Sequence, residues 1–354
     1  MPTPMGRFPV YVPDTKGAFA IPTPPEYPKL HTLCLAVAKR GAGKSTAVCS
    51  LIRDLLQAHL LDRVFVMSPT CGSNQALYAT VRVAPDDSYD QPGDKALQAV
   101  VKKVEEEAAE WREYVRKKEK WDRLQRLLRD PRVDLDAIPP ELMEGLDNFD
   151  QPPQSKYGHA PRLALLVDDC QGTKLFSTGC NNSFGHLCIK HRHVGEGLGM
   201  SVFILCQNFA SPGACNRFIR QNATHLMLFR ERDAEVMEKI AAEASGVHWS
   251  REDFLRAHRY AVSQSQHDFL FVEYNPPRLR RCFDEVLTDP SGRLQDGLET
   301  PTDGGSERPA QGPAEVGGRG GRRPVPARQG LLHRGHEAGP AAPKAGSAAP
   351  HHHH

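Results

Sequence analysis

The chain has 354 residues, of which 39% are hydrophobic and 25% charged, a balance typical of a globular protein with one sizeable core or two smaller ones. Its formal net charge of +2 excludes a histone-like polycation but leaves room for a DNA-binding surface confined to one face. The apolar runs are too short to span a bilayer, and the proline-rich N-terminus lacks the apolar stretch of a signal peptide. We therefore expect a soluble intracellular protein without membrane insertion.

Nine cysteines are spread along the chain at irregular spacing, without a Cys-x-x-Cys pair. Three of them, Cys34, Cys49 and Cys206, fall in apolar runs. Buried, unpaired thiols of this kind are typical of proteins from reducing compartments. The cysteines are therefore predicted to be reduced and to serve as small core residues.

Composition divides the chain into three parts. Residues 1–30 carry many prolines and are predicted to form an extended arm. Residues 31–288 contain apolar runs and helical periodicity, and they are predicted to form one domain. Residues 289–354 are rich in Gly, Pro, Ala and Arg, which predicts a disordered tail, and the final four histidines are typical of a purification tag.

Short apolar runs in the middle part are predicted to be buried strands. They are Leu33–Val37, Val64–Met67, Leu163–Val167, Val202–Cys206, Leu226–Phe229 and Phe269–Val272. Helical or loop segments separate most of them, and Ser45–His59 carries apolar residues at helical spacing. This alternation predicts an α/β fold with a mainly parallel central sheet and helices on both faces.

One stretch, about residues 86–158, interrupts the alternation. Within it, Ala96–Arg129 is dense in Glu, Lys and Arg, with Trp, Tyr and Leu interleaved. The pattern predicts one long or two shorter amphipathic helices inserted between strands of the sheet. Such an insertion is either a solvated decoration or a contact surface for a partner.

The strongest chemical signal is the segment AKRGAGKST, residues 38–46, between a predicted strand and a predicted helix. It matches the phosphate-loop pattern except that Ala38 stands at the first glycine position, a change of little consequence unless that position needs a positive φ. The predicted nucleotide-binding residues are Lys39, Arg40, Gly41, Ala42, Gly43, Lys44, Ser45 and Thr46.

Each part of this loop has a physical role in binding ATP. Gly41 and Gly43 let successive backbone N–H groups turn inward to form an anion-binding nest, and the following helix directs its positive end at the phosphates. Lys44 is predicted to reach the β- and γ-phosphates, and the Ser45 hydroxyl to bind Mg²⁺. ATP and Mg²⁺ are therefore the expected cofactors.

The strand Leu163–Val167 is followed by two acids, as in a Walker B element. Asp168 is predicted to hold Mg²⁺ through a water molecule, and Asp169 to orient and deprotonate the attacking water. Strand ends also carry acids for solubility alone, so the phosphate loop upstream is what favours catalysis here.

Gln207 directly follows the strand Val202–Cys206. If that strand lies between the phosphate-loop strand and the Walker B strand, its carboxyl end faces the γ-phosphate. An amide there can sense the phosphate and hold the attacking water. A glutamine at a strand end is otherwise unremarkable, so the order of the strands decides its role.

The stretch HRHVGEGLGMSVFILCQNFASPGACNRFIRQNATHLMLF, residues 191–229, resembles the FtsK/HerA superfamily of P-loop NTPases. In that group an arginine precedes an apolar strand ending in glutamine, and a basic-x-Asn segment follows, here Arg192, Gln207 and Arg220-x-Asn222. Within the superfamily the chain looks most like the poxvirus-type genome-packaging ATPases, whose Walker B strand ends in Asp-Asp. Residues 267–287 also resemble the closing strand and helix of those proteins, so the resemblance covers roughly residues 31–288.

This resemblance implies an ATPase that pushes double-stranded DNA, regardless of base sequence, into a preformed capsid. The expected assembly is a ring, with six subunits as the typical number, that contacts a capsid, portal or vertex protein at virion assembly sites in the cytoplasm or nucleus of an infected cell. Each ATP in such a ring is completed by an arginine from the neighbouring subunit. Arg192 is the first candidate for that arginine finger, followed by Arg220 and Arg217, although Arg192 is equally compatible with a plain surface cation.

Three other functions stay open from the sequence. A nucleotide kinase shares the phosphate loop but needs a lid carrying arginines. Another FtsK/HerA-like DNA translocase or a helicase shares all of the motifs. A capsid or DNA-associated structural protein that binds ATP with little turnover is the third, because the side chain of Asp169 is one methylene shorter than that of glutamate.

Overall fold

A computed structural model of the chain describes residues 21–134, 138–146, 148–177, 182–210, 213–246 and 248–298. All of them belong to one compact unit, Met1–Asp303. The first twenty residues of the predicted arm and the predicted tail from residue 299 onward lie outside the described residues.

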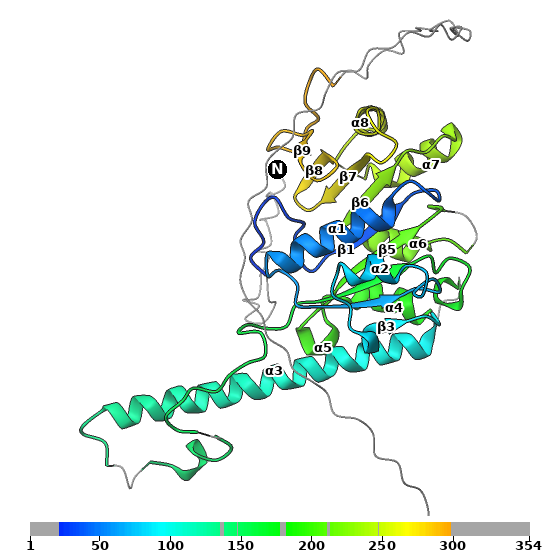
Figure 1. The fold of residues 1–354 in the computed structure, drawn as a ribbon. Helices are drawn as coiled ribbons and strands as arrows, with labels where there is room; N and C mark the ends of the chain where they lie inside the picture. The colour runs from blue at the N-terminus through cyan, green and yellow to red at the C-terminus, as the bar shows by residue number, and fades with distance from the viewer. Residues whose placement is uncertain are drawn as a thin grey trace, which may run out of the picture. The chain divides into compact units, whose positions relative to one another are not determined.

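The described strands form one sheet with helices around it (Figure 1). The strands are β1 (Leu33–Val37), β2 (Arg63–Met67), β3 (Ser88–Tyr89), β4 (Leu163–Asp168), β5 (Ser201–Cys206), β6 (His225–Phe229), β7 (Phe269–Tyr274), β8 (Pro277–Arg281) and β9 (Glu285–Val286). The helices are α1 (Lys44–Gln57), α2 (Gln75–Ala79), α3 (Asp94–Arg129), α4 (Ser183–Lys190), α5 (Val194–Gly197), α6 (Arg217–Asn222), α7 (Ala234–Ala244) and α8 (Arg251–Ala261). Short 3₁₀ turns lie at Pro85–Asp87, Pro140–Leu142 and Lys174–Phe176.

The strand order is β3-β2-β4-β5-β1-β6-β7-β8-β9. From β3 to β6 all neighbours pair in parallel, and β7, β8 and β9 add antiparallel strands at one side. The predicted α/β fold with a mainly parallel sheet is therefore confirmed. In the parallel part all carboxyl ends of the strands lie at one edge, which is where such sheets bind ligands.

Both faces of the sheet are covered, which explains why its central strands read as continuous apolar runs. Along β1 the side chains alternate: Leu33, Leu35 and Val37 join the cluster that includes α3, α4, α7 and α8. Cys34 and Ala36 point to the other face, where α1 packs. Cys34, Cys49 and Cys206 are buried free thiols, as predicted.

The charged insertion contains one helix rather than two, the 36-residue α3. Its first half belongs to the main core through Leu97, Val100 and Val104. Arg63 of β2 also ties it to the sheet, because its guanidinium donates to both oxygens of Asp87 at 2.7 and 2.8 Å and to Glu107 of α3 at 2.8 Å.

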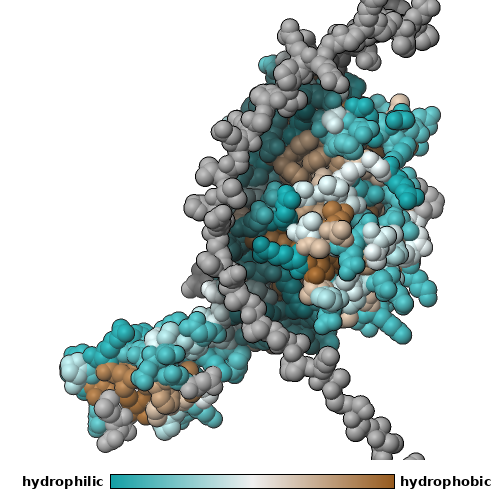
Figure 2. All heavy atoms as spheres, viewed as in Figure 1, coloured by the Kyte–Doolittle hydropathy of each residue, from teal (hydrophilic) through white to brown (hydrophobic). Residues whose placement is uncertain are grey.

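The second half of α3 has a small apolar cluster of its own with the loop that follows it. Leu124, Ile138 and Leu142 are the buried members of this outer cluster. Figure 2 shows a hydrophobic area at this end of the insertion. Three large apolar side chains of the insertion are exposed. They are Leu128, Met143 and Phe149.

Residues 275–287 differ from the closing helix that the resemblance suggested. The strands β8 and β9 occupy this segment, and β8 forms a hairpin with β7. Asn275 and Pro276 form the two-residue connection between the paired residues Tyr274 and Pro277, and so short a connection joins antiparallel strands. Packing also continues past residue 288, because the Trp249 indole donates to the Gly292 carbonyl at 2.8 Å and Leu294 packs against the core.

A buried cluster of charges fastens the described end of the N-terminal arm to the antiparallel strands. Glu273 of β7 and Arg280 of β8, both nearly inaccessible to solvent, form an ion pair at 2.9 Å. The same guanidinium donates to the backbone carbonyls of Pro25 and Glu26 at 2.7 and 2.8 Å. Arg278 is a second partner of Glu273.

Among the described helices, none combines the length and the apolar run that crossing a bilayer requires.

The charge cluster predicts a specific dependence of stability on pH. Burial by itself raises the pKa of the Glu273 carboxyl, but the nearby His225 imidazole, the hydrogen bond from Arg278 and the charge of Arg280 lower it to about 2. Because this folded-state pKa lies below the ordinary value of 4.5, the carboxylate stabilises the fold above about pH 4.5, and this contribution is lost as the pH falls toward 2.

We therefore expect Glu273→Gln to lower the free energy of unfolding at pH 7, with a difference from wild type that shrinks as the pH falls from about 4.5. Urea unfolding at a series of pH values, over the range in which both proteins are folded, measures this difference. A difference that stays constant over that range would contradict the assignment.

Candidate functional site

The loop between β1 and α1 has the backbone that phosphate binding requires. Gly41 and Gly43 adopt left-handed conformations with φ of 83° and 92°. Ala38 is not among the residues with positive φ, so an alanine fits at the first position of the pattern. The helix begins directly after Gly43, whose carbonyl accepts from the Ala47 N–H at 2.9 Å. The N–H groups at the start of α1 therefore open toward the edge of the sheet.

The side chains of the loop differ in how far they are fixed. Lys44 is buried, with 8% of its surface exposed. Lys39 is exposed and pairs at 2.7 Å with Glu231, which follows β6. Arg40 and Thr46 are exposed at the rim of the loop. The loop thus combines one buried cation with several accessible groups.

Asp168, the last residue of β4, is almost completely buried, with 2% exposure. Burial raises the pKa of its carboxyl, while the nearby Ser45 hydroxyl, the hydrogen bond from Tyr78 and the charge of Lys44 act in the opposite direction. A carboxylate next to the Ser45 hydroxyl is a set of hard oxygen donors, which is what Mg²⁺ prefers. These two residues therefore fit the predicted magnesium site.

Asp169 and Gln207 lie in contact at the same edge of the sheet. The predicted role of Gln207 requires β5 to lie between the phosphate-loop strand and the strand that carries Asp168. The structure has this order, because β5 pairs with β1 on one side and with β4 on the other. The Gln207 side-chain amide donates to Asp169 Oδ1 at 2.7 Å. Asp169 itself has a left-handed backbone with φ of 53°, which turns the chain sharply at the end of β4.

Gln171 fastens the loops after β4 and β5 to each other. Its side-chain oxygen accepts from the Gln207 backbone N–H at 2.6 Å, and its amide donates to the Asn208 carbonyl at 3.1 Å. The sequence analysis missed this residue. A glutamine in a polar loop carries no pattern that would distinguish it.

His267 is a second residue of the site that the sequence analysis did not find. It lies in the loop before β7, whose amino end reaches the same edge because β7 runs antiparallel to β6. The imidazole Nδ1 lies 3.2 Å from the Ala42 carbonyl oxygen. A Cβ atom added at Gly43 would come within 3.1 Å of that nitrogen. The imidazole therefore packs on the outside of the phosphate loop.

Arg192 lies at the opposite edge of the sheet from the phosphate loop. It lies in the turn after α4, next to the amino end of β5. The carbonyl of its neighbour His191 accepts a hydrogen bond from the N–H of Met200, the residue before β5. The Arg192 carbonyl lies close to Gly199, which packs on His31 ahead of β1. The side chain is exposed. The structure therefore does not bring Arg192 to the site within one subunit.

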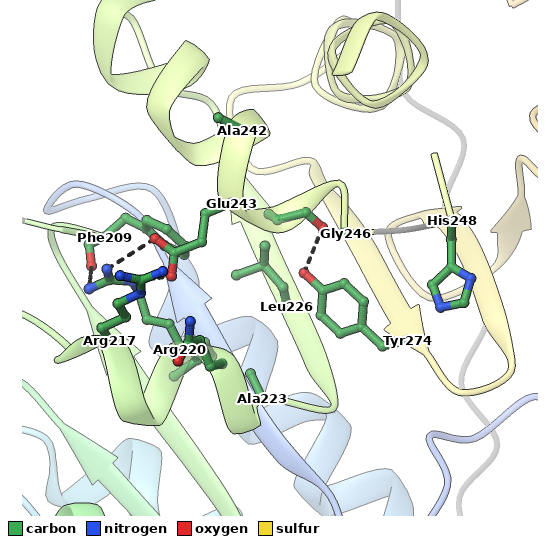
Figure 3. Close-up of a pocket in the computed structure, with 13 residues that line it drawn as sticks. Phe209, Arg217, Arg220, Ala223, Leu226, Ala242, Glu243, Gly246, His248 and Tyr274 are labelled. Carbon is green, nitrogen blue, oxygen red and sulfur yellow. Dashed lines mark hydrogen bonds and ion pairs between the residues drawn. The ribbon is translucent and has the colours of Figure 1, made fainter. Parts of the chain in front are cut away.

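Arg220 and Arg217 lie on α6, over the face of the sheet opposite to α1 (Figure 3). Arg220 forms a two-pronged ion pair with Glu243 of α7, at 2.9 and 3.0 Å, and stacks over the Phe209 ring. It also donates to the carbonyls of Phe209 and Cys215. Its guanidinium is thus fully engaged inside the subunit, whereas Arg217 is exposed.

Both arginines line a cavity of about 590 Å³ that reaches Leu35, Leu226 and Tyr274 on the sheet. This cavity is separate from the phosphate loop, because Leu35 points to the face away from α1. A nucleotide held by the phosphate loop would therefore lie at the edge of the sheet and not in this cavity.

No family model and no curated protein matches the sequence. Among solved structures, the chain is similar to B204, the DNA-packaging ATPase from Sulfolobus turreted icosahedral virus, at 11% identity and a TM-score of 0.43, over 71% of this chain and 97% of that one. The genome-packaging NTPase B204 from Sulfolobus turreted icosahedral virus 2, in complex with AMP, matches at 11% identity and a TM-score of 0.42, over 71% and 96%. EssC (ATPases 2 and 3) from Geobacillus thermodenitrificans matches at 12% identity and a TM-score of 0.39, over 73% and 39%.

Two of these three matched structures are of viral DNA- or genome-packaging enzymes.

The loop geometry predicts that Gly43→Ala weakens ATP binding about tenfold or more. The substitution forces a side chain into a left-handed backbone, at a cost of about 1–2 kcal/mol, and presses its Cβ against His267. Ala38→Gly is the matched control, because Ala38 needs no positive φ and should keep affinity close to wild type. Titration of a fluorescent ATP analogue measures both; equal affinities for Gly43→Ala and wild type would refute the loop assignment.

Proposed function

We propose that this chain is an ATP-hydrolysing motor that moves double-stranded DNA, and that its cargo is a viral genome threaded into a capsid. The observation that carries the proposal is the position of β5 between β1 and β4, with Gln207 in contact with Asp169. An extra strand at this place, with a catalytic acid after the magnesium aspartate, is the arrangement that separates motor ATPases from nucleotide kinases.

In this proposal the chain binds ATP at the carboxyl edge of the sheet. The backbone of the phosphate loop and Lys44 hold the phosphates, and Ser45 and Asp168 hold Mg²⁺. The metal ion neutralises charge that develops on the β- and γ-phosphate oxygens.

Asp169 and Gln207 act on the attacking water. In the described part of the chain Gln207 occupies only Oδ1 of Asp169, so Oδ2 is the oxygen available to accept a proton from water. The Gln207 amide is positioned to orient that water and to respond to the γ-phosphate. Gln171 keeps the two strand ends together while this happens.

DNA contact in this proposal is electrostatic and independent of base sequence. The arginines of β8 are used inside the subunit, because Arg278 and Arg280 pair with Glu273, and Arg281 pairs with Asp268. Lys190, at the amino edge, is exposed and is the better candidate, since the described residues show no ion pair for it.

A head-to-tail ring agrees with the placement of Arg192. ATP is bound at the carboxyl edge of the parallel strands, and Arg192 lies at the amino edge. Heterologous contacts bring unlike surfaces of successive subunits together, so such a ring can present the Arg192 of one copy to the ATP of the next. Six subunits and a capsid, portal or vertex partner inside an infected cell complete the proposal.

Two alternatives keep specific support. Another FtsK/HerA-like translocase or a helicase would use the same phosphate loop and acids, and strand separation would distinguish a helicase. An ATP-binding structural protein with little turnover is favoured by the side chain of Asp169, which is one methylene shorter than that of glutamate.

The decisive test is steady-state ATP hydrolysis with and without long duplex DNA, on wild type and Lys44→Ala side by side. We expect duplex DNA to raise the wild-type rate several-fold and Lys44→Ala to have no measurable rate, because the variant loses the charge that stabilises the γ-phosphate. A Lys44-dependent rate that ignores DNA would keep the ATPase and remove the DNA motor. Nucleotide binding without turnover would favour the structural alternative.

The trans role of Arg192 predicts that Arg192→Ala lowers turnover by about 10³- to 10⁵-fold. Mixed rings of Arg192→Ala and Asp169→Asn subunits should regain part of the activity, because each subunit supplies what the other lacks. Arg53→Ala, on the exposed surface of α1, is the control and should leave turnover unchanged. Rings shown to be mixed but without any recovered activity would argue against a trans arginine.

A further inference from the structure

A tyrosine from the loop after β2 reaches the proposed magnesium aspartate. β2 is the neighbour of β4 in the sheet, so the segment that follows β2 lies at the same edge as Asp168. This segment leads into α2, where Tyr78 is 4% exposed. Its hydroxyl donates to Asp168 Oδ2 at 3.0 Å.

The backbone that delivers Tyr78 is held by its own hydrogen bonds. The Ser68 hydroxyl accepts from the Thr70 N–H at 3.2 Å, and the Asn74 side chain donates to the Thr70 hydroxyl at 3.0 Å. The Asn74 carbonyl then accepts from the Tyr78 N–H at 3.0 Å. The tyrosine ring packs in the apolar cluster beneath α1. Tyr78 is thus fixed at both its backbone and its ring.

The Tyr78 hydroxyl therefore holds one oxygen of the Asp168 carboxylate, and the Ser45 hydroxyl lies near the same carboxylate. When a carboxylate binds a metal ion through one of its oxygens, a hydrogen-bond donor to the second oxygen fixes the orientation of the carboxylate plane. Mg²⁺ demands this more than other cations, because it accepts only near-ideal octahedral geometry.

We propose that Tyr78 is a positioning residue for metal binding, and that its hydroxyl holds Oδ2 of Asp168 so that the opposite oxygen faces the Mg²⁺ of a bound Mg·ATP. This inference rests on the proposed ATPase function and assigns one further residue to it. Burial and the negative charge of Asp168 raise the pKa of the Tyr78 phenol, which keeps it protonated as a donor at neutral pH.

Tyr78→Phe tests the proposal because it removes only the hydroxyl and keeps the ring in its apolar cluster. The affinity of the full chain for a fluorescent ADP is measured first in EDTA and then with rising Mg²⁺. In EDTA, we expect Tyr78→Phe to bind the fluorescent ADP as tightly as wild type does. With Mg²⁺ added, the metal concentration that gives half of the gain in ADP affinity should be about 10-fold or more higher for the variant.

Tyr274→Phe is the matched control. It also loses a buried tyrosine hydrogen bond, to the Ala244 carbonyl at 3.0 Å, but on the face of the sheet away from α1. Its Mg²⁺ midpoint should equal that of wild type. Any general loss of stability affects both variants and is monitored by thermal unfolding.

A double-mutant cycle separates positioning from a structural effect. In an Asp168→Asn background, Tyr78→Phe should shift the Mg²⁺ midpoint no further, because the carboxylate that it orients is gone. An unchanged midpoint in Tyr78→Phe, or an equal shift in both backgrounds, would overturn the proposal. Failure of the wild-type chain to gain affinity from Mg²⁺ would instead count against the proposed function itself.

Discussion

The pairing of β5 with both β1 and β4 is the constraint on which the candidate site depends. Parallel strands expose their carboxyl ends at one edge, so this order alone brings together the phosphate loop, the acids after β4 and the amide of Gln207. Side chains in the interior of the central strands β1, β4, β5 and β6 are buried on both faces and belong to the core. The chemistry is therefore left to the residues at which the strands end, and their distances are set by backbone hydrogen bonds.

The sequence was informative wherever structure is decided locally. Continuous apolar runs predicted the central strands, and the glycines of the phosphate loop predicted its backbone, because both depend on neighbouring residues. Tyr78, Gln171 and His267 could not be found in this way. Each lies in a loop without a pattern and meets the site only because the sheet places that loop there. The closing β-hairpin was missed because family resemblance set the expectation.

Several arginines hold the fold together. Arg63 fastens α3 to β2, Arg220 joins α6 to α7, and Arg280 fastens the arm to β7 and β8. A planar guanidinium can bind a carboxylate with two bonds and still donate to carbonyls, which lysine cannot do with the same geometry. Part of the chain's positive charge is therefore used for pairing inside the fold and is not available to a DNA-binding surface.

The long helix α3 has a consequence for how the chain opens under native conditions. Its first half is part of the main core, and its second half relies on the small cluster of Leu124, Ile138 and Leu142. Local stability follows the amount of buried apolar contact, so the amide groups of the outer turns exchange with solvent through openings that leave the sheet intact. One continuous helix therefore belongs to two cooperative units, and the boundary between them falls where the side chains of α3 leave the main core.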